Sequence, residues 1–380
     1  MVKGKKEVFK MGKMKVRFIG MLIAVLFLVT LVGVSVNASK TYLIGLDVKI
    51  ISNTWEWLFG QSFQWYCTDN GYVWVMNEAG GDPAKQLTQS KRMIETGVDG
   101  LIVCAQDKNA SKPIVDWALE ANIPVFTTDA DINHPDVKMY IGFSGYLAGQ
   151  KLGGKIVEHL KNEVEPIGQV KGRVLEMLGP LGGASAIDRS EGFHSIIDEY
   201  PDVEVVQAVG EFQETPAKRE ALALLRRDSN IDAVYSANGP MCVGAVEAMR
   251  DLDMDIAKVF VATMDANPGV LNKIRAGEID ICVDQPCPFY NPIAVYYLVK
   301  YLEEGEGALP KVGEVINAED IDISGEEHLG TDIWANKTAW APAKIGMING
   351  HLWFQTNAIE VTEENVDAGY LWANVEVAGW

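Results

Sequence analysis

The feature of this sequence that most constrains its fold is a regular alternation of short apolar runs with longer amphipathic segments. From Thr41 onward, four runs rich in β-branched and aromatic residues are separated by segments of helical length: 42–48, 72–76, 101–104 and 125–128. The runs are apolar throughout, as is typical of parallel strands that are covered on both faces. This βαβ repetition predicts an open, doubly wound parallel sheet.

One of the segments between these strands carries complete helix boundary signals. Asp82 provides an N-cap, Pro83 suits the first turn, and Gly97 provides a stop. The sequence therefore predicts a helix from Pro83 to the residue before Gly97.

A second series of strands follows the first, again with helices between them: 173–177, 203–209, 233–235, 259–263 and 279–283. Residues 138–144 are expected to connect the two series. We therefore predict an α/β protein with two doubly wound lobes joined by a hinge. The N-terminal lobe is assigned to 39–143 and 286–317, and the C-terminal lobe to 144–285.

The tail, assigned as 318–380, is predicted to be a hinge return and a tryptophan-rich extension. Two readings of it stay open, a β-rich appendage packed over the lobes or hinge, and a contribution to ligand capture or to a partner surface. Five of the ten tryptophans lie in it: Trp334, Trp340, Trp353, Trp372 and Trp380.

The first 38 residues have the pattern of a signal peptide. A basic segment precedes an almost wholly apolar run at 18–34, and Val36-Asn37-Ala38 offers the small residues that signal peptidase reads. We predict export by a cleavable signal peptide to the periplasm or another extracytoplasmic space. The run is just long enough to span a bilayer, so an uncleaved anchor is the alternative.

The charge balance excludes nucleic acid as a partner. The chain has 33 basic and 52 acidic side chains, a net charge of −19, and residues 1–38 hold seven of the basic groups and only one acidic group. The remaining chain is therefore strongly acidic, and its field repels polyphosphates.

No constellation for catalysis, metal binding or a cofactor stands out in the sequence. The five histidines are scattered, the five cysteines form no CxxC pair, and no base–nucleophile pair is evident. A Cys282–Cys287 disulfide is conceivable in an oxidising compartment. The turn Gly179-Pro180-Leu181-Gly182-Gly183 follows a strand and opens a helix without a phosphate-binding motif, which suits a ligand-facing turn.

Polar and aromatic residues follow the predicted strands, at the sheet edge where open α/β folds bind ligands. The candidate ligand-binding residues are Trp55, Glu56, Asp129, Arg189, Phe212, Asn238, Asp265 and Gln285. Carboxylates, amides and a guanidinium can form paired hydrogen bonds with adjacent hydroxyls, and an aromatic face can cover the C–H side of a sugar ring. This set suits a neutral polyhydroxylated molecule.

The chain resembles the ribose/galactose-type periplasmic sugar-binding proteins of ABC importers, which have the type I periplasmic binding protein fold. The resemblance covers roughly residues 41–324. The segments that carry it are Gly81-Asp-Pro-Ala-Lys-Gln86, Ile94-Glu-Thr-Gly-Val-Asp-Gly100, Ala121-Asn-Ile-Pro-Val-Phe-Thr-Thr-Asp129, Arg189-x-x-Gly-Phe193 and Met264-Asp265.

The resemblance assigns roles to most of the candidate residues. Trp55 and Phe212 match the family's ring-stacking aromatics, and Asp129 matches its bidentate carboxylate. The other matching positions are Arg189, Asn238, Asp265 and Gln285.

Three positions depart from the ribose type, and the sugar is therefore expected to differ from ribose. Ala130 replaces an arginine, Glu56 replaces a second aromatic, and Cys104 replaces a polar residue. Glu56 is accordingly a candidate extra acceptor.

Structural explanations remain open for the same residues at this point. Trp55 or Trp57 could pack a helix, Asp129 and Asp265 could be helix caps, and Arg189 could lie exposed on a helix. The resemblance nevertheless implies a non-enzymatic, exported protein that captures a neutral monosaccharide or polyol and delivers it to the membrane permease of an ABC importer. The alternatives are a periplasmic sugar sensor that signals to a membrane receptor, and a sugar-modifying enzyme.

Overall fold

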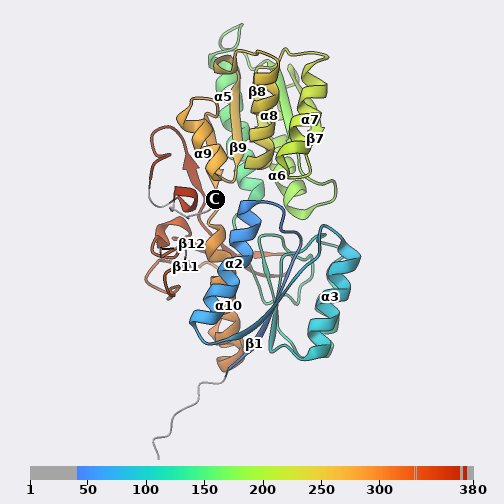
Figure 1. Ribbon diagram of the computed structural model, residues 1–380, viewed down its shortest axis with the longest axis vertical. Helices are drawn as coiled ribbons and strands as arrows, with labels where there is room; N and C mark the ends of the chain where they lie inside the picture. Colours follow the sequence, from blue (N-terminus) through green and yellow to red (C-terminus); the bar gives the residue numbers. More distant parts are fainter. Residues whose placement is uncertain (1–40, 329, 331, 369–370, 375–380) are drawn as a thin grey trace, which may run out of the picture. The chain divides into compact units, whose positions relative to one another are not determined.

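The computed structural model describes residues 41–328, 330, 332–368 and 371–374. In this part of the chain the strands form two separate sheets (Figure 1). The predicted signal peptide, residues 1–38, lies outside the described residues. No helix among the described residues combines the length and the apolar character needed to cross a bilayer.

The first sheet has the strand order β11-β12-β13-β5-β4-β3-β1-β2. Its strands are β1 (Leu43–Val48), β2 (Val73–Glu78), β3 (Gly100–Val103), β4 (Val125–Thr128), β5 (Met139–Gly142), β11 (Val315–Ile316), β12 (Ala343–Ile348) and β13 (His351–Gln355). All neighbouring strands from β13 to β2 run parallel, whereas β12 runs antiparallel to both of its neighbours, β11 and β13. Residues 138–144, expected to be a connection, thus contain strand β5.

The second sheet has the order β14-β10-β9-β8-β6-β7, and only β14 is antiparallel to its neighbour. Its strands are β6 (Gly172–Leu178), β7 (Val203–Val209), β8 (Ala233–Ser236), β9 (Phe260–Met264), β10 (Ile281–Asp284) and β14 (Ile359–Val361). Two lobes with mostly parallel sheets confirm the predicted fold class.

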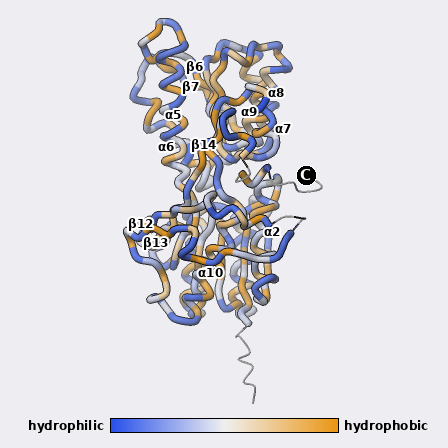
Figure 2. Tube along the Cα trace, turned by 90° about the vertical axis from the view of Figure 1, so that its left-hand side faces the viewer, coloured by the Kyte–Doolittle hydropathy of each residue, from blue (hydrophilic) through white to orange (hydrophobic). Residues whose placement is uncertain are grey.

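Helices cover both faces of each sheet. The first sheet packs against α2 (Thr54–Asp69) and α10 (Cys287–Glu304) on one face and α3 (Pro83–Thr96) and α4 (Lys112–Glu120) on the other. The second packs against α7 (Glu214–Leu225), α8 (Gly239–Asp251) and α9 (Pro268–Arg275) on one face and α5 (Gly145–Asn162) and α6 (Ala184–Ile197) on the other. Hydrophobic residues follow this layering and concentrate along the strands (Figure 2).

Helix α3 confirms the prediction from its boundary signals. The Asp82 carboxylate accepts hydrogen bonds from the backbone N–H groups of Ala84 and Lys85, at 2.8 and 3.2 Å. Gly97 closes the helix in the left-handed conformation, with φ of 81°, which a residue without Cβ adopts without strain.

Three segments of the chain pass between the two sheets. They connect β5 to α5, β10 to α10, and β13 to β14. The second of these crossings leads into α10, whose residues are almost all buried as far as Val299. A helix that is apolar all round is a core element, and α10 accordingly contacts α2 and strands β3, β4 and β5.

The tail completes both sheets, with β12 and β13 in the first and β14 in the second. Trp334, Trp340 and Trp372 are buried, and the Trp353 Nε1–H donates to the Gly142 carbonyl at 3.0 Å. Trp380 lies outside the described residues. Three of these four tryptophans therefore pack in the interior and Trp353 is partly buried, and none of the four lines the cavity described below.

All five cysteines are buried and free, so Cys282 and Cys287 are not joined. Burial raises the pKa of each thiol, which keeps it protonated and unreactive at neutral pH.

The buried carboxyl group of Asp47, on β1, predicts a pH-dependent stability. Its Oδ2 accepts a hydrogen bond from Ser90 Oγ at 2.6 Å, whereas Oδ1 has no partner among the described residues. Burial raises its pKa to about 7. Between pH 4 and 7 the unfolded chain therefore releases this proton while the folded chain keeps it, and the free energy of unfolding falls over that window.

Asp47→Asn should remove this dependence. The difference between the two free energies of unfolding, variant minus wild type, should therefore increase by about 2 kcal/mol or more from pH 4 to pH 8. Urea unfolding at several pH values measures it, with Asp202→Asn as an exposed control. Parallel pH curves for the wild type and Asp47→Asn would contradict the prediction.

Candidate functional site

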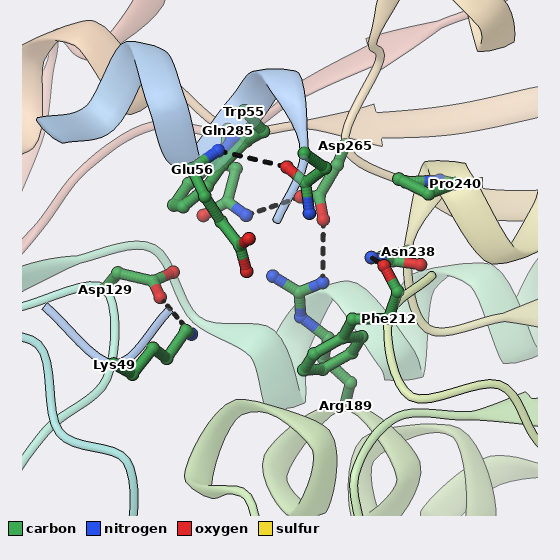
Figure 3. Close-up of a pocket in the computed structure, with 11 residues that line it drawn as sticks. Lys49, Trp55, Glu56, Asp129, Arg189, Phe212, Asn238, Pro240, Asp265 and Gln285 are labelled. Carbon is green, nitrogen blue, oxygen red and sulfur yellow. Dashed lines mark hydrogen bonds and ion pairs between the residues drawn. The ribbon is translucent and has the colours of Figure 1, made fainter. Parts of the chain in front are cut away.

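The eight candidate residues from the sequence lie around one cavity (Figure 3). Each follows the carboxyl end of a strand or lies in the first turns of the next helix, and together they come from both lobes. The remaining lining residues are Lys49, Asn53 and Pro240. The cavity is narrow, with a volume of about 20 Å³.

The start of α2 places Trp55 and Glu56 at the cavity. Asn53 is the N-cap, and its Oδ1 accepts a hydrogen bond from the Glu56 backbone N–H at 3.0 Å. The Trp55 ring stacks on Phe59 with 5.3 Å between centroids. Glu56 Oε2 accepts from the backbone N–H and the hydroxyl of Ser52, and burial raises the pKa of this carboxyl group despite nearby Lys49.

A buried ion pair joins Lys49 to Asp129 in the first lobe. Lys49 Nζ lies 2.6 Å from Asp129 Oδ2, and the Asp129 side chain is only 2% exposed. Burial alone would lower the pKa of Lys49, but the charge of Asp129 and the hydrogen bond to it, together with the electrostatic interactions with Cys104 and Glu56, outweigh burial and raise the pKa. The lysine therefore stays charged.

The second lobe contains a matching pair, Arg189 with Asp265. One guanidinium nitrogen of Arg189 donates to Asp265 Oδ2 at 2.9 Å and to the Ala237 carbonyl at 2.5 Å. Gln285 donates its amide N–H to the other oxygen of Asp265, and the Tyr290 hydroxyl donates to Gln285 Oε1 at 2.9 Å. Burial raises the pKa of Asp265, although Arg189 and Gln285 oppose the rise.

Three of the site residues have strained backbone conformations. Asp129, Phe212 and Asp265 have φ of 61°, 59° and 64°. This left-handed region is unfavourable for residues other than glycine and especially for a bulky side chain, and such strain concentrates at functional sites. Asn238, the N-cap of α8, fixes the Phe212 backbone by donating its amide N–H to the Phe212 carbonyl at 3.1 Å.

Two buried hydrogen-bond donors, on side chains of residues that line the cavity, have no partner among the described residues. They are Nε of Arg189, a residue that is 3% exposed, and Nε1 of Trp55, a residue that is 7% exposed. Leaving a buried donor unsatisfied costs about 1–3 kcal/mol, and native proteins rarely do so without a reason.

The structure decides between the alternatives that the sequence left open. Arg189 is buried rather than exposed on its helix, and neither Asp129 nor Asp265 is the N-cap of a helix. Trp55 packs within α2 and also lines the cavity, whereas Trp57 packs edge-on against Trp65 and does not line it.

Lys49, Asn53 and Pro240 are the lining residues that the sequence analysis did not select. Each had a local signal. Lys49 directly follows the first strand, Asn53 precedes a helix as a capping residue, and Pro240 stands in the first turn after Asn238. Applying the strand-end criterion to Lys49 would have added it to the site.

Within the described residues, no cluster of three or more His, Cys, Asp or Glu side chains is arranged to hold a metal ion. The cavity instead offers two cations, three carboxyl groups, three amides and two aromatic rings. Such groups bind a neutral molecule rich in hydroxyls through directional hydrogen bonds.

Comparison with known proteins places this site in a family. A family model described as a periplasmic binding protein domain matches residues 44–307, more than half of the chain. The chain belongs to this family. Membership in the periplasmic binding protein family places the chain outside the cytoplasm and agrees with the resemblance to sugar-binding members.

The curated relatives described here are named as binding proteins and not as enzymes. The ribose import binding protein of Bacillus subtilis is 25% identical over 246 residues, covering 65% of this chain and 77% of the relative. A galactofuranose-binding protein of Escherichia coli is 25% identical over 228 residues, covering 58% and 69%. A D-apiose import binding protein of Actinobacillus succinogenes is 29% identical over 241 residues, covering 62% and 74%.

Solved structures share the fold of this periplasmic binding protein. An ABC transporter solute-binding protein from Bacillus halodurans with bound myo-inositol has a TM-score of 0.69 at 21% identity, covering 88% of this chain and 99% of that one. A galactofuranose-binding protein has a TM-score of 0.68 at 18% identity, covering 86% and 96%.

The buried Lys49–Asp129 pair predicts a measurable coupling. Lys49→Met leaves a buried carboxylate without its cation and should lower the free energy of unfolding by about 3 kcal/mol. Adding Asp129→Asn should recover at least half of this loss, because the unpaired charge is then removed. Denaturant unfolding of both single variants and the double variant completes the cycle. Additive effects of the two substitutions would contradict the pairing.

Proposed function

We propose that this chain is an exported solute-binding protein that captures a neutral monosaccharide or polyol between its two lobes and delivers it to an ABC-type membrane permease. The observation that carries the proposal is the pair of unpartnered donors on residues that line the cavity, Arg189 Nε and Trp55 Nε1. Hydroxyl oxygens of a sugar would accept from both of them.

The charges around the cavity favour a neutral ligand. Glu56, Asp129 and Asp265 face only Lys49 and Arg189, and both cations are already engaged with aspartates. An anionic sugar would add a negative charge to a desolvated site that has no free cation among its described lining residues, which costs several kcal/mol. Neutral hydroxyl groups instead donate to carboxylates.

Contacts from both lobes give a physical basis for closure on the ligand. Trp55, Glu56 and Asp129 belong to the first lobe, and Arg189, Phe212 and Asp265 to the second. A solute that contacts both sets binds the closed form more tightly than the open form and so shifts the population toward it. The closed form is the one that would dock on the permease.

A periplasmic sugar sensor is the second candidate. A fructose-binding periplasmic domain of a hybrid two-component system has a similar fold, with a TM-score of 0.66 at 22% identity. The curated relatives are named for import, which favours transport. We also propose that signal peptidase removes residues 1–38 and that the protein catalyses no reaction.

A ligand screen tests the proposed function directly. We expect neutral pentoses, hexoses or polyols to raise the melting temperature of the protein, whereas the uronate and phosphate of the same sugar should not. A ligand at 100 times its Kd stabilises a protein by about 2.7 kcal/mol, which such a screen detects. For the best ligand, calorimetry at pH 7 should show that Arg189→Ala weakens binding by about 2 kcal/mol or more.

Two outcomes of this screen would count against the proposal. Tighter binding of an anionic sugar than of its neutral counterpart would contradict the charge assignment. Unchanged affinity in a folded Arg189→Ala protein would remove this residue from the site. Arg219→Ala, which alters an exposed arginine on α7, is the matched control.

The two tryptophans at the start of α2 should separate binding from packing. Trp55→Ala should weaken binding of the same ligand by about 1–3 kcal/mol, because the covered ring face is lost. Trp57→Ala should leave the affinity within twofold and lower only the melting temperature. The reverse ranking in calorimetry would contradict the assignment of Trp55 as the ring-stacking residue.

A further inference from the structure

A second cavity adjoins the proposed sugar site. Lys49, Glu56 and Phe212 line both cavities, so these three side chains form the boundary between them. The second cavity is the larger of the two, with a volume of about 130 Å³ against about 20 Å³ for the first. It has room for several water molecules, which a group the size of a sugar ring could displace.

Small residues from both lobes make up much of the wall of the second cavity. Gly81 and Ala105 come from the first lobe, and Pro180 and Gly183 come from the second. Pro180 and Gly183 belong to the turn at 179–183, which the sequence suggested as ligand-facing, and they do not line the first cavity. Small side chains keep this space open.

Two amide side chains offer hydrogen bonds in this second cavity. Gln106 Oε1 is buried and has no partner among the described residues, while the Gln106 backbone N–H is fixed by a 2.8 Å bond to Gln86 Oε1. Gln213 is the N-cap residue of α7, yet its side chain makes no capping bond. Amides both donate and accept, which suits hydroxyl groups.

The boundary at Phe212 is held in a strained conformation. Glu211 and Phe212 are successive residues in the left-handed region, with φ of 56° and 59°, which is unfavourable for residues with long or bulky side chains. Gly179 leaves room for the Phe212 ring, because a Cβ at that position would collide with the ring. The strain thus keeps an aromatic surface between the two cavities.

We propose that the natural ligand is a neutral sugar or polyol that carries a second ring or a substituent of similar size. Its first ring would lie in the first cavity with Trp55 and Arg189, and the substituent would lie in the second cavity with Gln106 and Gln213. The substituent is neutral, because Glu56 and Glu211 outnumber Lys49 there. This inference rests on the proposed sugar-binding function.

Calorimetry with matched one-ring and two-ring ligands tests this inference. The probes are galactose with melibiose, arabinose with α-1,5-arabinobiose, and myo-inositol with galactinol. In at least one pair, the two-ring compound should bind the mature protein at least tenfold more tightly than its one-ring partner.

Variants of the second cavity then assign the gain to its residues. Gln213→Trp should fill the space and bring the ratio of the two Kd values to about one, and Gln106→Ala should reduce the ratio at least threefold. Gln169→Trp, on an exposed loop before β6, is the matched control and should leave the ratio unchanged. Melting curves establish that each variant is folded.

The possible outcomes separate this inference from the proposed function. Binding of single rings with no gain from a second ring in any pair would overturn the inference and leave the proposed function standing. A tenfold gain that survives in folded Gln213→Trp and Gln106→Ala proteins would also overturn it. Absence of binding by every compound would overturn both.

Discussion

Parallel strands that are covered on both faces leave only their ends for polar groups, and the site depends on this constraint. Strands β3, β4, β8 and β10 are buried at every residue. The charged and amide side chains of the site therefore follow the strands directly or lie in the first turns of the next helix. Because parallel strands in one sheet share their carboxyl edge, those positions converge. The two aspartates that follow β4 and β9 then meet a cation each, in both lobes alike.

The site is connected to the segments that cross between the lobes. Asp265 is bonded to Gln285, and Gln285 to the hydroxyl of Tyr290, which lies on α10 in the first lobe. The same hydroxyl oxygen accepts from the Phe143 backbone N–H at 3.3 Å, just before α5. Two of the three crossings thus meet at one tyrosine. This short chain of hydrogen bonds therefore links Asp265, at the proposed site, to two of the segments that cross between the lobes.

The elements with strong local signals were predictable from the sequence, and those set by distant pairing were not. Helix α3 has its own cap and stop residues, and the strand-end positions follow from βαβ periodicity. The tail strands β13 and β14 gave no comparable signal, because they are defined by partners such as β5 and β10 far away in the chain. The unpartnered nitrogens of Arg189 and Trp55 likewise depend on which neighbours the fold brings close. The pairing of Lys49 with Asp129 joins residues 80 positions apart, so no local pattern marks it.

The position of the tail strands has a consequence for how the chain assembles during its synthesis. Strand β13 lies between β5 and β12, and β14 pairs with β10 at the edge of the second sheet. Because the chain is synthesised from its N-terminus, β5 and β10 are made before β13 and β14. Until those later strands are available, one edge of β5 and one edge of β10 have unpaired backbone N–H and C=O groups. Neither lobe reaches its full width until residues 351–361 have been added.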